Sequence, residues 1–233
     1  MAAAKYKTAF IIGAGQGLSA SLARLLSAEG MQVALAARDT RKLEPLASEI
    51  EAFTVQADAA DPTSIATAFR AVDERLGPAD VLIYNASGRL RGPFIELDAA
   101  AVRSVLEVSA FGGFLAAQEA ARRMLAQESG AIFFTGASAS IKGYAQSAPF
   151  AMGKFALRGL AQSLARELAP RGIHVAHFVI DGGIRSAARP VPKDAPDSLL
   201  DPDAIARTYL HVLGQDRSAW TWEVELRPWV ERF

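Results

Sequence analysis

Apolar and polar positions follow two different periods along this chain. Short, almost wholly apolar runs are separated by longer segments in which apolar residues recur at helical spacing. A run that is apolar throughout is typical of a strand covered on both faces. The pattern predicts strands at residues 8–12, 33–37, 53–56, 81–84, 132–135, 175–180 and 221–226, and helices at 19–29, 41–50, 62–76, 99–127 and 149–169.

Glycine and proline mark the ends of the predicted helices. Gly30, Gly77 and Gly130 each follow a helix, and Pro62 and Pro149 stand where a helix begins. Repeated strand–helix–strand units imply right-handed crossovers and therefore a parallel sheet. We expect a doubly wound α/β fold of about seven strands with helices on both faces, in a single domain over residues 1–233.

Residues 182–203 interrupt this pattern. They contain Pro190, Pro192, Pro196 and Pro202 and show no helical or strand period. An irregular connection of about 20 residues in a compact domain is often functional. This segment is either a lid-like insertion or an ordinary surface loop.

Composition narrows the class of protein. The 233 residues are 51% hydrophobic and 21% charged, which is too apolar for a disordered chain. Basic and acidic residues number 25 each, so no net charge favours nucleic acid or a membrane surface, and Arg122 and Arg123 read as a solvated helix face. Cysteine is absent, and the first residues form too short an apolar run for a leader or a membrane span. We expect a soluble, cytoplasmic protein with no nucleic-acid or membrane partner.

A glycine-rich turn follows the first predicted strand. It reads Gly13-Ala-Gly15-Gln16-Gly17-Leu18 and leads into the first predicted helix. Glycines at such a turn let the backbone approach a pyrophosphate, and the helix N-terminus offers unpaired N–H groups and positive potential. The turn therefore predicts a Rossmann-type dinucleotide site formed by Gly13, Gly15, Gln16, Gly17 and Leu18. The alternative is a tight turn without a ligand.

The end of the second predicted strand bears on which dinucleotide binds. Arg38 and Asp39 stand just beyond it, where the residue that faces the adenosine ribose is expected. Arg38 can neutralise a 2′-phosphate and favours NADP(H). Asp39 could instead accept from a free 2′-hydroxyl, so NAD(H) stays open, as does a solvated loop charge at Arg38.

Further motifs follow the glycine turn in order. Ser19 ends a Gly-x-x-x-Gly-x-Ser sequence, Asp58 follows the third predicted strand, and Asn85-Ala86 follow the fourth. A later helix contains Phe150-Ala-Met-Gly-Lys154. In type and spacing these motifs resemble the glycine turn, the adenine-contacting Asp, the Asn-Asn-Ala-Gly segment and the Tyr-x-x-x-Lys helix of the short-chain dehydrogenase/reductase family.

The resemblance implies hydride transfer between a nicotinamide cofactor and a small carbonyl or alcohol. In that family a tyrosine supplies the proton, a serine hydrogen-bonds the carbonyl and an asparagine holds a relay water. Here Phe150 stands at the tyrosine position, Ala137 at the serine position and Ser109 at the asparagine position. Lys154 matches the family's lysine, which also binds the nicotinamide ribose; the alternative is an ordinary surface lysine. The resemblance further implies a homodimer or homotetramer.

Three residues near these positions are candidates for a replacement proton donor. Ser138 is next to the serine position, and Tyr144 precedes Phe150 in the loop that passes the same site. Asp181 stands where the family places residues beside the nicotinamide, and a desolvated carboxyl group there could donate a proton. The alternative is that Asp181 caps the lid segment or pairs with Arg185.

The sequence thus leaves two functions open. One is an NADP(H)-binding oxidoreductase with a non-standard proton donor and a small-molecule substrate. The other is a dinucleotide-binding sensor or scaffold protein without redox turnover. No metal site is expected, because His174 and His177, three apart on one predicted strand, point to opposite faces.

Overall fold

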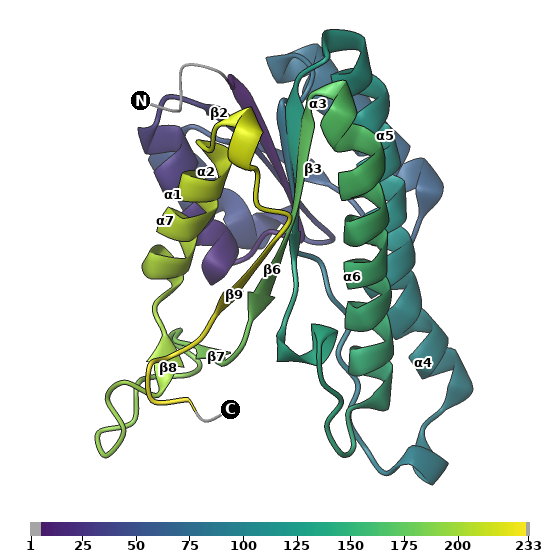
Figure 1. Cartoon of the computed structure of the whole chain (residues 1–233), viewed down its shortest axis with the longest axis vertical. Coiled ribbons are helices and arrows are strands. Elements are labelled where there is room, and N and C mark those ends of the chain that lie inside the picture. Colours follow the sequence, from purple (N-terminus) through teal and green to yellow (C-terminus); the bar gives the residue numbers. More distant parts are fainter. Residues whose placement is uncertain (1–5, 232–233) are drawn as a thin grey trace.

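The computed structural model describes residues 6–231 and shows one α/β domain in three layers (Figure 1). Residues 1–5, which bear on the expected absence of a leader, lie outside the described residues. A sheet stands between two helical layers. One layer holds α1 (Leu18–Ala28), α2 (Glu44–Ile50) and α7 (Pro202–Leu213). The other holds α3 (Pro62–Leu76), α4 (Ala99–Leu106), α5 (Gly112–Gln127) and α6 (Ala148–Leu168).

The central sheet confirms the predicted fold class. Within the described residues it has seven strands in the order β3-β2-β1-β4-β5-β6-β9, and every neighbouring pair is parallel. Each strand overlaps one of the predicted runs. The strands are β1 (Thr8–Ile12), β2 (Gln32–Ala37), β3 (Phe53–Gln56), β4 (Val81–Tyr84), β5 (Gly130–Thr135), β6 (Ile173–Ile180) and β9 (Glu223–Leu226).

Both faces of the sheet are covered, which explains why most of the strand sequences are almost wholly apolar. On β1, Ala9 and Ile11 belong to the core formed with α1 and α7, while Phe10 and Ile12 belong to the core formed with α3, α5 and α6. β1 pairs with β2 on one side and β4 on the other, so the chain reverses its direction of winding there. A crevice outside the carboxyl ends of the strands is expected at this point.

α4 and α5 form one helical segment, as predicted for residues 99–127, joined by a π turn, η4 (Glu107–Phe111). By length and composition, this is the one described segment that could cross a membrane. Its inner side packs on the domain, because a Cβ at Gly112 would lie 2.4 Å from the Tyr84 hydroxyl and one at Gly113 2.5 Å from Leu157. The segment is therefore a layer of this domain, covering the sheet.

The expectation for residues 182–203 is wrong at the end of the segment. Pro202 begins α7, which packs against α1 on the sheet. Asp201 caps this helix by accepting from the Asp203 N–H at 2.9 Å. The rest of the segment includes two short paired strands, β7 (Gly183–Ile184) and β8 (Leu199–Leu200). The remaining short helices are η2 (Thr40–Leu43), η3 (Phe94–Glu96), η5 (Ser138–Ser140), η6 (Ala169–Arg171) and η7 (Arg217–Ala219).

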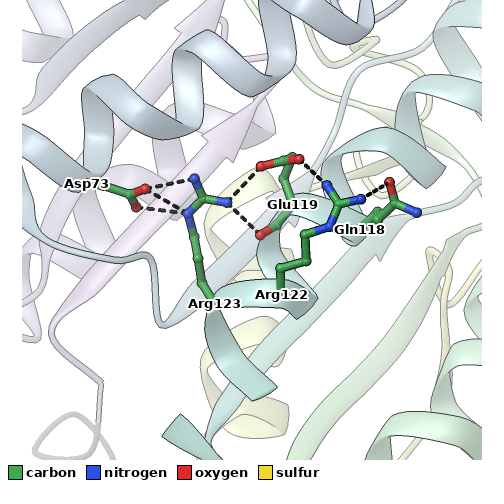
Figure 2. Close-up of polar contacts among 5 residues, drawn as sticks. All are labelled: Asp73, Gln118, Glu119, Arg122 and Arg123. Atoms are coloured by element: carbon green, nitrogen blue, oxygen red, sulfur yellow. Dashed lines mark hydrogen bonds and ion pairs between the residues drawn. The ribbon is translucent and has the colours of Figure 1, made fainter. Parts of the chain in front are cut away.

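Arg123 ties α5 to α3 (Figure 2). Its Nε donates to both carboxylate oxygens of Asp73 at 2.8 and 2.9 Å, and another guanidinium nitrogen donates to the carboxylate and carbonyl oxygens of Glu119 at 2.8 Å each. The guanidinium also lies over the Phe69 ring, 4.9 Å from its centroid. The prediction that these two arginines form a solvated face is confirmed for Arg122, whose side chain is 61% exposed. It is wrong for Arg123, whose side chain is 17% exposed.

Candidate functional site

The glycine turn between β1 and α1 has one closed and two open positions. Gly13 has a φ of +83°, and a Cβ there would lie 2.3 Å from the Ala86 nitrogen. Around Gly15 and Gly17 a Cβ would meet nothing within 4 Å. The sequence therefore uses Gly13 to pack two loops together, while Gly15 and Gly17 leave space that a ligand backbone or phosphate can enter.

Ser19, at the last position of the turn motif, joins the turn to the loop after β4. Its hydroxyl donates to the Gly13 carbonyl oxygen at 3.2 Å. The Asn85 amide donates to the Ser19 hydroxyl oxygen at 2.7 Å and to the Gly13 carbonyl oxygen at 3.3 Å. Asn85 and Ser19 thus hold the shape of the turn, and Leu18, buried in the core, anchors the start of α1.

A cleft of about 910 Å³ opens from this turn at the carboxyl ends of β1, β2, β3 and β4. It brings together seven of the predicted cofactor-binding residues: Gly13, Gly15, Gln16, Arg38, Asp58, Asn85 and Ala86. Gly17 lines a neighbouring cavity of about 340 Å³, shared with Gln16 and with Arg185, Pro190 and Val191 of the 182–203 segment. Leu18 and Lys154 are not among the residues that line the large cleft.

The cleft wall beyond β2 is basic. Arg38 and Lys42 both line it and both are exposed. Asp39 is held by Arg41, whose Nε and terminal nitrogen donate to its two carboxylate oxygens at 2.9 and 3.0 Å. Asp39 also lines the cleft, but both of its carboxylate oxygens already accept from Arg41. Lys42 was missed in the sequence, although its place soon after Arg38 was a usable signal.

Asp58 lines the same cleft, after β3, which pairs with β2. Its N–H donates to the Ser64 hydroxyl at 2.9 Å, and its carboxylate accepts from the Ala60 N–H at 3.0 Å. These bonds fix the Asp58 backbone and one carboxylate oxygen. Because the side chain is exposed, it is open to a ligand in the cleft.

Lys154 is buried at the carboxyl end of β5, which argues against an ordinary surface lysine. The residue is 3% exposed, and its Nζ donates to the Thr135 carbonyl oxygen at 2.7 Å. Burial, with a smaller contribution from the Arg89 guanidinium, lowers the pKa of the ammonium to about 8. Lys154 is thus a strongly perturbed amine of the kind that gathers at functional sites.

Phe150 lies one helical turn before Lys154 and between two cations. The Arg89 guanidinium carbon is 4.8 Å from the centroid of its ring, and the Lys154 Nζ is 5.9 Å from it. The Phe150 ring carries no proton to donate. Ala137, at the serine position, places only a methyl group there, while its N–H donates to the Ser140 hydroxyl at 3.1 Å.

The three candidate proton donors lie in different settings. Asp181 is 2% exposed, and its carboxylate lies 3.0 Å from the Lys142 Nζ and 3.8 Å from Arg227. The expected pairing of Asp181 with Arg185 is wrong, because Arg185 pairs with Asp201 at 3.0 Å.

Tyr144 is 47% exposed and interacts through its hydroxyl with Lys142. Asp181 chiefly, and Tyr144 to a smaller degree, raise the pKa of the Lys142 ammonium. Ser138 is half-buried at the start of η5.

Ser109 sits in the π turn η4 and supports the loop that carries Arg89. Its hydroxyl accepts from the Gly88 N–H at 3.0 Å, and a Cβ at Gly153 would lie 2.8 Å from the Ser109 Cβ. π turns inside helices often occur at functional sites. Here the turn lets a small residue bind the Gly88 backbone where α6 passes closely.

The two histidines of β6 lie on opposite faces, as predicted. The His174 ring contacts Phe133, in the core shared with α7. The His177 ring faces Gly136 and pairs with Glu223, its Nδ1 3.0 Å from the carboxylate. Burial lowers the pKa of His177 to about 4, although Glu223 acts in the other direction.

The family model described as short chain dehydrogenase matches residues 7–190. The chain belongs to the short-chain dehydrogenase family. The matched range contains the glycine turn, Asp58, Asn85 and the helix with Phe150 and Lys154, and it ends inside the 182–203 segment.

Similar proteins cover nearly the whole chain. The crystal structure of a short-chain dehydrogenase from Rhodopseudomonas palustris is 38% identical, with a TM-score of 0.84, and the match covers 96% of this chain and 99% of that one. An uncharacterized oxidoreductase of Staphylococcus aureus is 27% identical over 228 residues, which are 95% of this chain and 97% of that protein. A metagenomic short-chain oxidoreductase in complex with NADP is 26% identical, with a TM-score of 0.83, covering 97% of this chain and 98% of its own.

Proposed function

We propose that this chain is an NADP(H)-dependent oxidoreductase that acts on a small carbonyl or alcohol. The observation that carries the proposal is the cleft that runs from the open glycine turn to Arg38 and Lys42. An open turn at a helix N-terminus suits a pyrophosphate, and two lysine or arginine side chains suit a 2′-phosphate. The similarity to a short-chain oxidoreductase in complex with NADP supports the same cofactor.

The cofactor proposal is tested by titrating the protein with NADPH and with NADH while following cofactor fluorescence. We expect tighter binding of NADPH. Arg38→Ser and Lys42→Ser should each weaken the binding of NADPH by about 10- to 100-fold, because each removes a charge-assisted hydrogen bond. The binding of NADH should stay nearly unchanged. Arg70→Ser, on the exposed side of α3, is the charge-matched control. Equal binding of the two nucleotides in every variant would contradict the assignment.

When bound, NADP(H) would supply or accept the hydride. Lys154 would hold the nicotinamide ribose, because its ammonium is buried and fixed at the carboxyl end of β5. Asp58, which lines the same cleft as Arg38, would contact the adenine end. Phe150 and Ala137 would shape the pocket for the reacting carbon without taking part in proton transfer.

For the proton donor we propose Tyr144. Asp181 already faces two basic side chains, with its carboxylate 3.0 Å from the Lys142 Nζ and 3.8 Å from Arg227. The Tyr144 side chain is 47% exposed, and its hydroxyl interacts with Lys142. On carbonyl reduction the phenol O–H bond would break as the alkoxide takes the proton, and Lys142, held by Asp181, would stabilise the phenolate.

Once a carbonyl compound that the protein reduces has been identified, three variants distinguish the candidate proton donors. Tyr144→Phe should lower kcat by about 100- to 10,000-fold with NADPH affinity unchanged. Asp181→Asn should act more weakly, because it only releases Lys142. Ser138→Ala is the competing assignment. A large loss in this variant with full activity in Tyr144→Phe would move the role to Ser138.

A second function, dinucleotide binding without redox turnover, is favoured by the Phe150 ring and the Ala137 methyl group at the reacting end. Phe150→Tyr with Ala137→Ser separates the two functions. The chain is a sensor or scaffold if the native protein fails to oxidise NADPH with every carbonyl of a broad panel while the double variant oxidises NADPH with at least one of them. If the native chain is active and the double variant is impaired, another donor already operates.

We also propose a homo-oligomer that buries the outer face of η4, α5 and α6. Phe111 and Phe114 stack with centroids 6.1 Å apart and are 45% and 41% exposed, and Met152 and Phe155 on α6 are 49% and 44% exposed. An exposed apolar face of this kind is typical of an interface. Light scattering should show a dimer or tetramer. Phe114→Asp or Phe155→Asp should give a smaller species. Phe94→Asp, on η3, should leave the size of the oligomer unchanged.

For residues 182–201, the part of the segment that precedes α7, we propose a lid over the bound nucleotide. The segment already shares a cavity with Gln16 and Gly17 of the turn. Saturating NADPH should slow proteolytic cleavage within it several-fold. Unchanged cleavage at saturation would leave it an ordinary surface loop.

A further inference from the structure

Two cations lie against the ring of Phe150, at the reacting end of the proposed site. Arg89 comes from the loop after β4, and Lys154 comes from α6. Their charged groups are 4.8 and 5.9 Å from the ring centroid. Phe150 is thus a platform on which positive charge gathers, in addition to being a residue without an acidic proton.

The segment that carries Arg89 is held on both sides. The Gly88 N–H donates to the Ser109 hydroxyl at 3.0 Å, and the Gly92 N–H donates to the Gln146 carbonyl oxygen at 3.1 Å. A guanidinium that rests on an aromatic ring through its face keeps its N–H edge for another group. Arg89 is exposed, so that edge is accessible to a ligand from solvent.

Among the described residues, no carboxylate forms an ion pair with Arg89 or Lys154. The nearby acid of the site, Asp181, is already engaged by Lys142 and Arg227. Arg89 and Lys154 are also close enough to repel, since Arg89 contributes to the lowered pKa of Lys154. A bound anion would relieve that repulsion.

We propose that Arg89 binds a carboxylate of the substrate, so that the substrate class is oxo acids on reduction and hydroxy acids on oxidation. This inference rests on the proposed function. A planar carboxylate matches the fork of N–H groups on a guanidinium in a two-point contact. The Phe150 ring lies 4.8 Å from the guanidinium carbon and 5.9 Å from the Lys154 Nζ, so a carboxylate on Arg89 would lie near the reacting carbon.

The test uses matched acid and ester probes on the protein saturated with NADPH. Phenylglyoxylate and acetoacetate are compared with their methyl esters, by fluorescence change of the bound NADPH and by its oxidation. The native chain should bind the acids at least 10-fold more tightly than the esters. Arg89→Met should weaken the binding of the acids by about 10- to 100-fold and leave the binding of the esters unchanged. Arg89→Lys should bind the acids with an affinity between those of the native chain and Arg89→Met.

Arg91→Met is the control, because Arg91 is exposed on the same loop and its loss changes the net charge equally. This variant should bind the acids with an affinity within about twofold of that of the native chain. Equal binding of acids and esters, or equal losses in the Arg89 and Arg91 variants, would overturn this inference while the proposed function stands. Failure of NADPH itself to bind would overturn the proposed function and this inference with it.

Discussion

The Nζ of Lys154 donates to the carbonyl oxygen of Thr135 at 2.7 Å, where both residues are buried. An ammonium with one carbonyl partner is poorly solvated, and its pKa is therefore lowered to about 8. Such a group destabilises the folded chain, and a site that keeps it exchanges stability for function.

Replacing Lys154 should accordingly stabilise the fold and impair binding. Between the lowered pKa of about 8 and the ordinary value of 10.5 the unfolded chain holds more protons, so the destabilisation is full below pH 8 and fades as pH rises to 10.5. Lys154→Met should raise the free energy of unfolding by roughly 1–3 kcal/mol at pH 7 and by less at pH 10. Urea unfolding at both pH values checks this, and a lower stability at pH 7 would contradict it.

The same Lys154→Met protein should bind NADPH about 10- to 100-fold more weakly, because a charge-assisted hydrogen bond to the ribose is lost. Cofactor fluorescence measures this loss. Unchanged affinity in a stabilised protein would remove Lys154 from the cofactor site.

The buried imidazole of His177 predicts acid sensitivity. Its pKa is lowered from 6.5 to about 4, so the unfolded chain takes up a proton that the folded chain refuses in this range. Stability should therefore fall as pH drops from 6.5 to 4, by up to about 3 kcal/mol. Unfolding midpoints of His177→Asn should vary less with pH than those of the native chain. His211→Asn, at an exposed position, should keep the native slope.

Two glycines of the turn should respond in opposite ways to the same change. Gly13→Ala places a methyl group 2.3 Å from the Ala86 nitrogen at a φ of +83°. The free energy of unfolding should therefore fall by about 3 kcal/mol or more. Gly15→Ala meets open space and should fold normally while blocking the nucleotide. Thermal unfolding and NADPH titration of both variants test the contrast. Normal NADPH binding in Gly15→Ala would show that the nucleotide lies elsewhere.

The link between α3 and α5 gives a stability test far from the site. Arg123→Met removes the contacts to Asp73 and Glu119 seen in Figure 2, and should lower the free energy of unfolding by about 1–3 kcal/mol. Arg122→Met, whose side chain is 61% exposed, should change it by less than about 0.5 kcal/mol. Similar effects in urea unfolding would mean that the Asp73 contact contributes little.

The sequence predicts the sheet well because most of its strands are marked locally, by a short and almost wholly apolar run. α7 was missed although its start repeats a pattern that was recognised earlier in the chain. Asp61-Pro62 begins α3, with Asp61 accepting from the Thr63 N–H, and Asp201-Pro202 begins α7 in the same way. The neighbouring prolines of the 182–203 segment obscured this repeat.

The site was predictable only where it is local. The turn, Arg38, Asp58 and Lys154 can be recognised from adjacent residues. The contact of Arg89 with Phe150 and the pairing of Lys142 with Asp181 join distant segments, so no local pattern announces them. Their physical basis is the meeting of strand ends at one edge of the sheet, which brings separate loops together.

The bonds among Gly13, Ser19 and Asn85 have a further consequence for how a nucleotide associates. They link the turn to the loop after β4 before any ligand arrives. Little conformational entropy then remains to be lost on association, and the bound shape is already present in the free protein. Rapid-mixing records of NADPH capture should follow a single exponential whose rate rises linearly with nucleotide concentration, without a slow isomerisation of this turn.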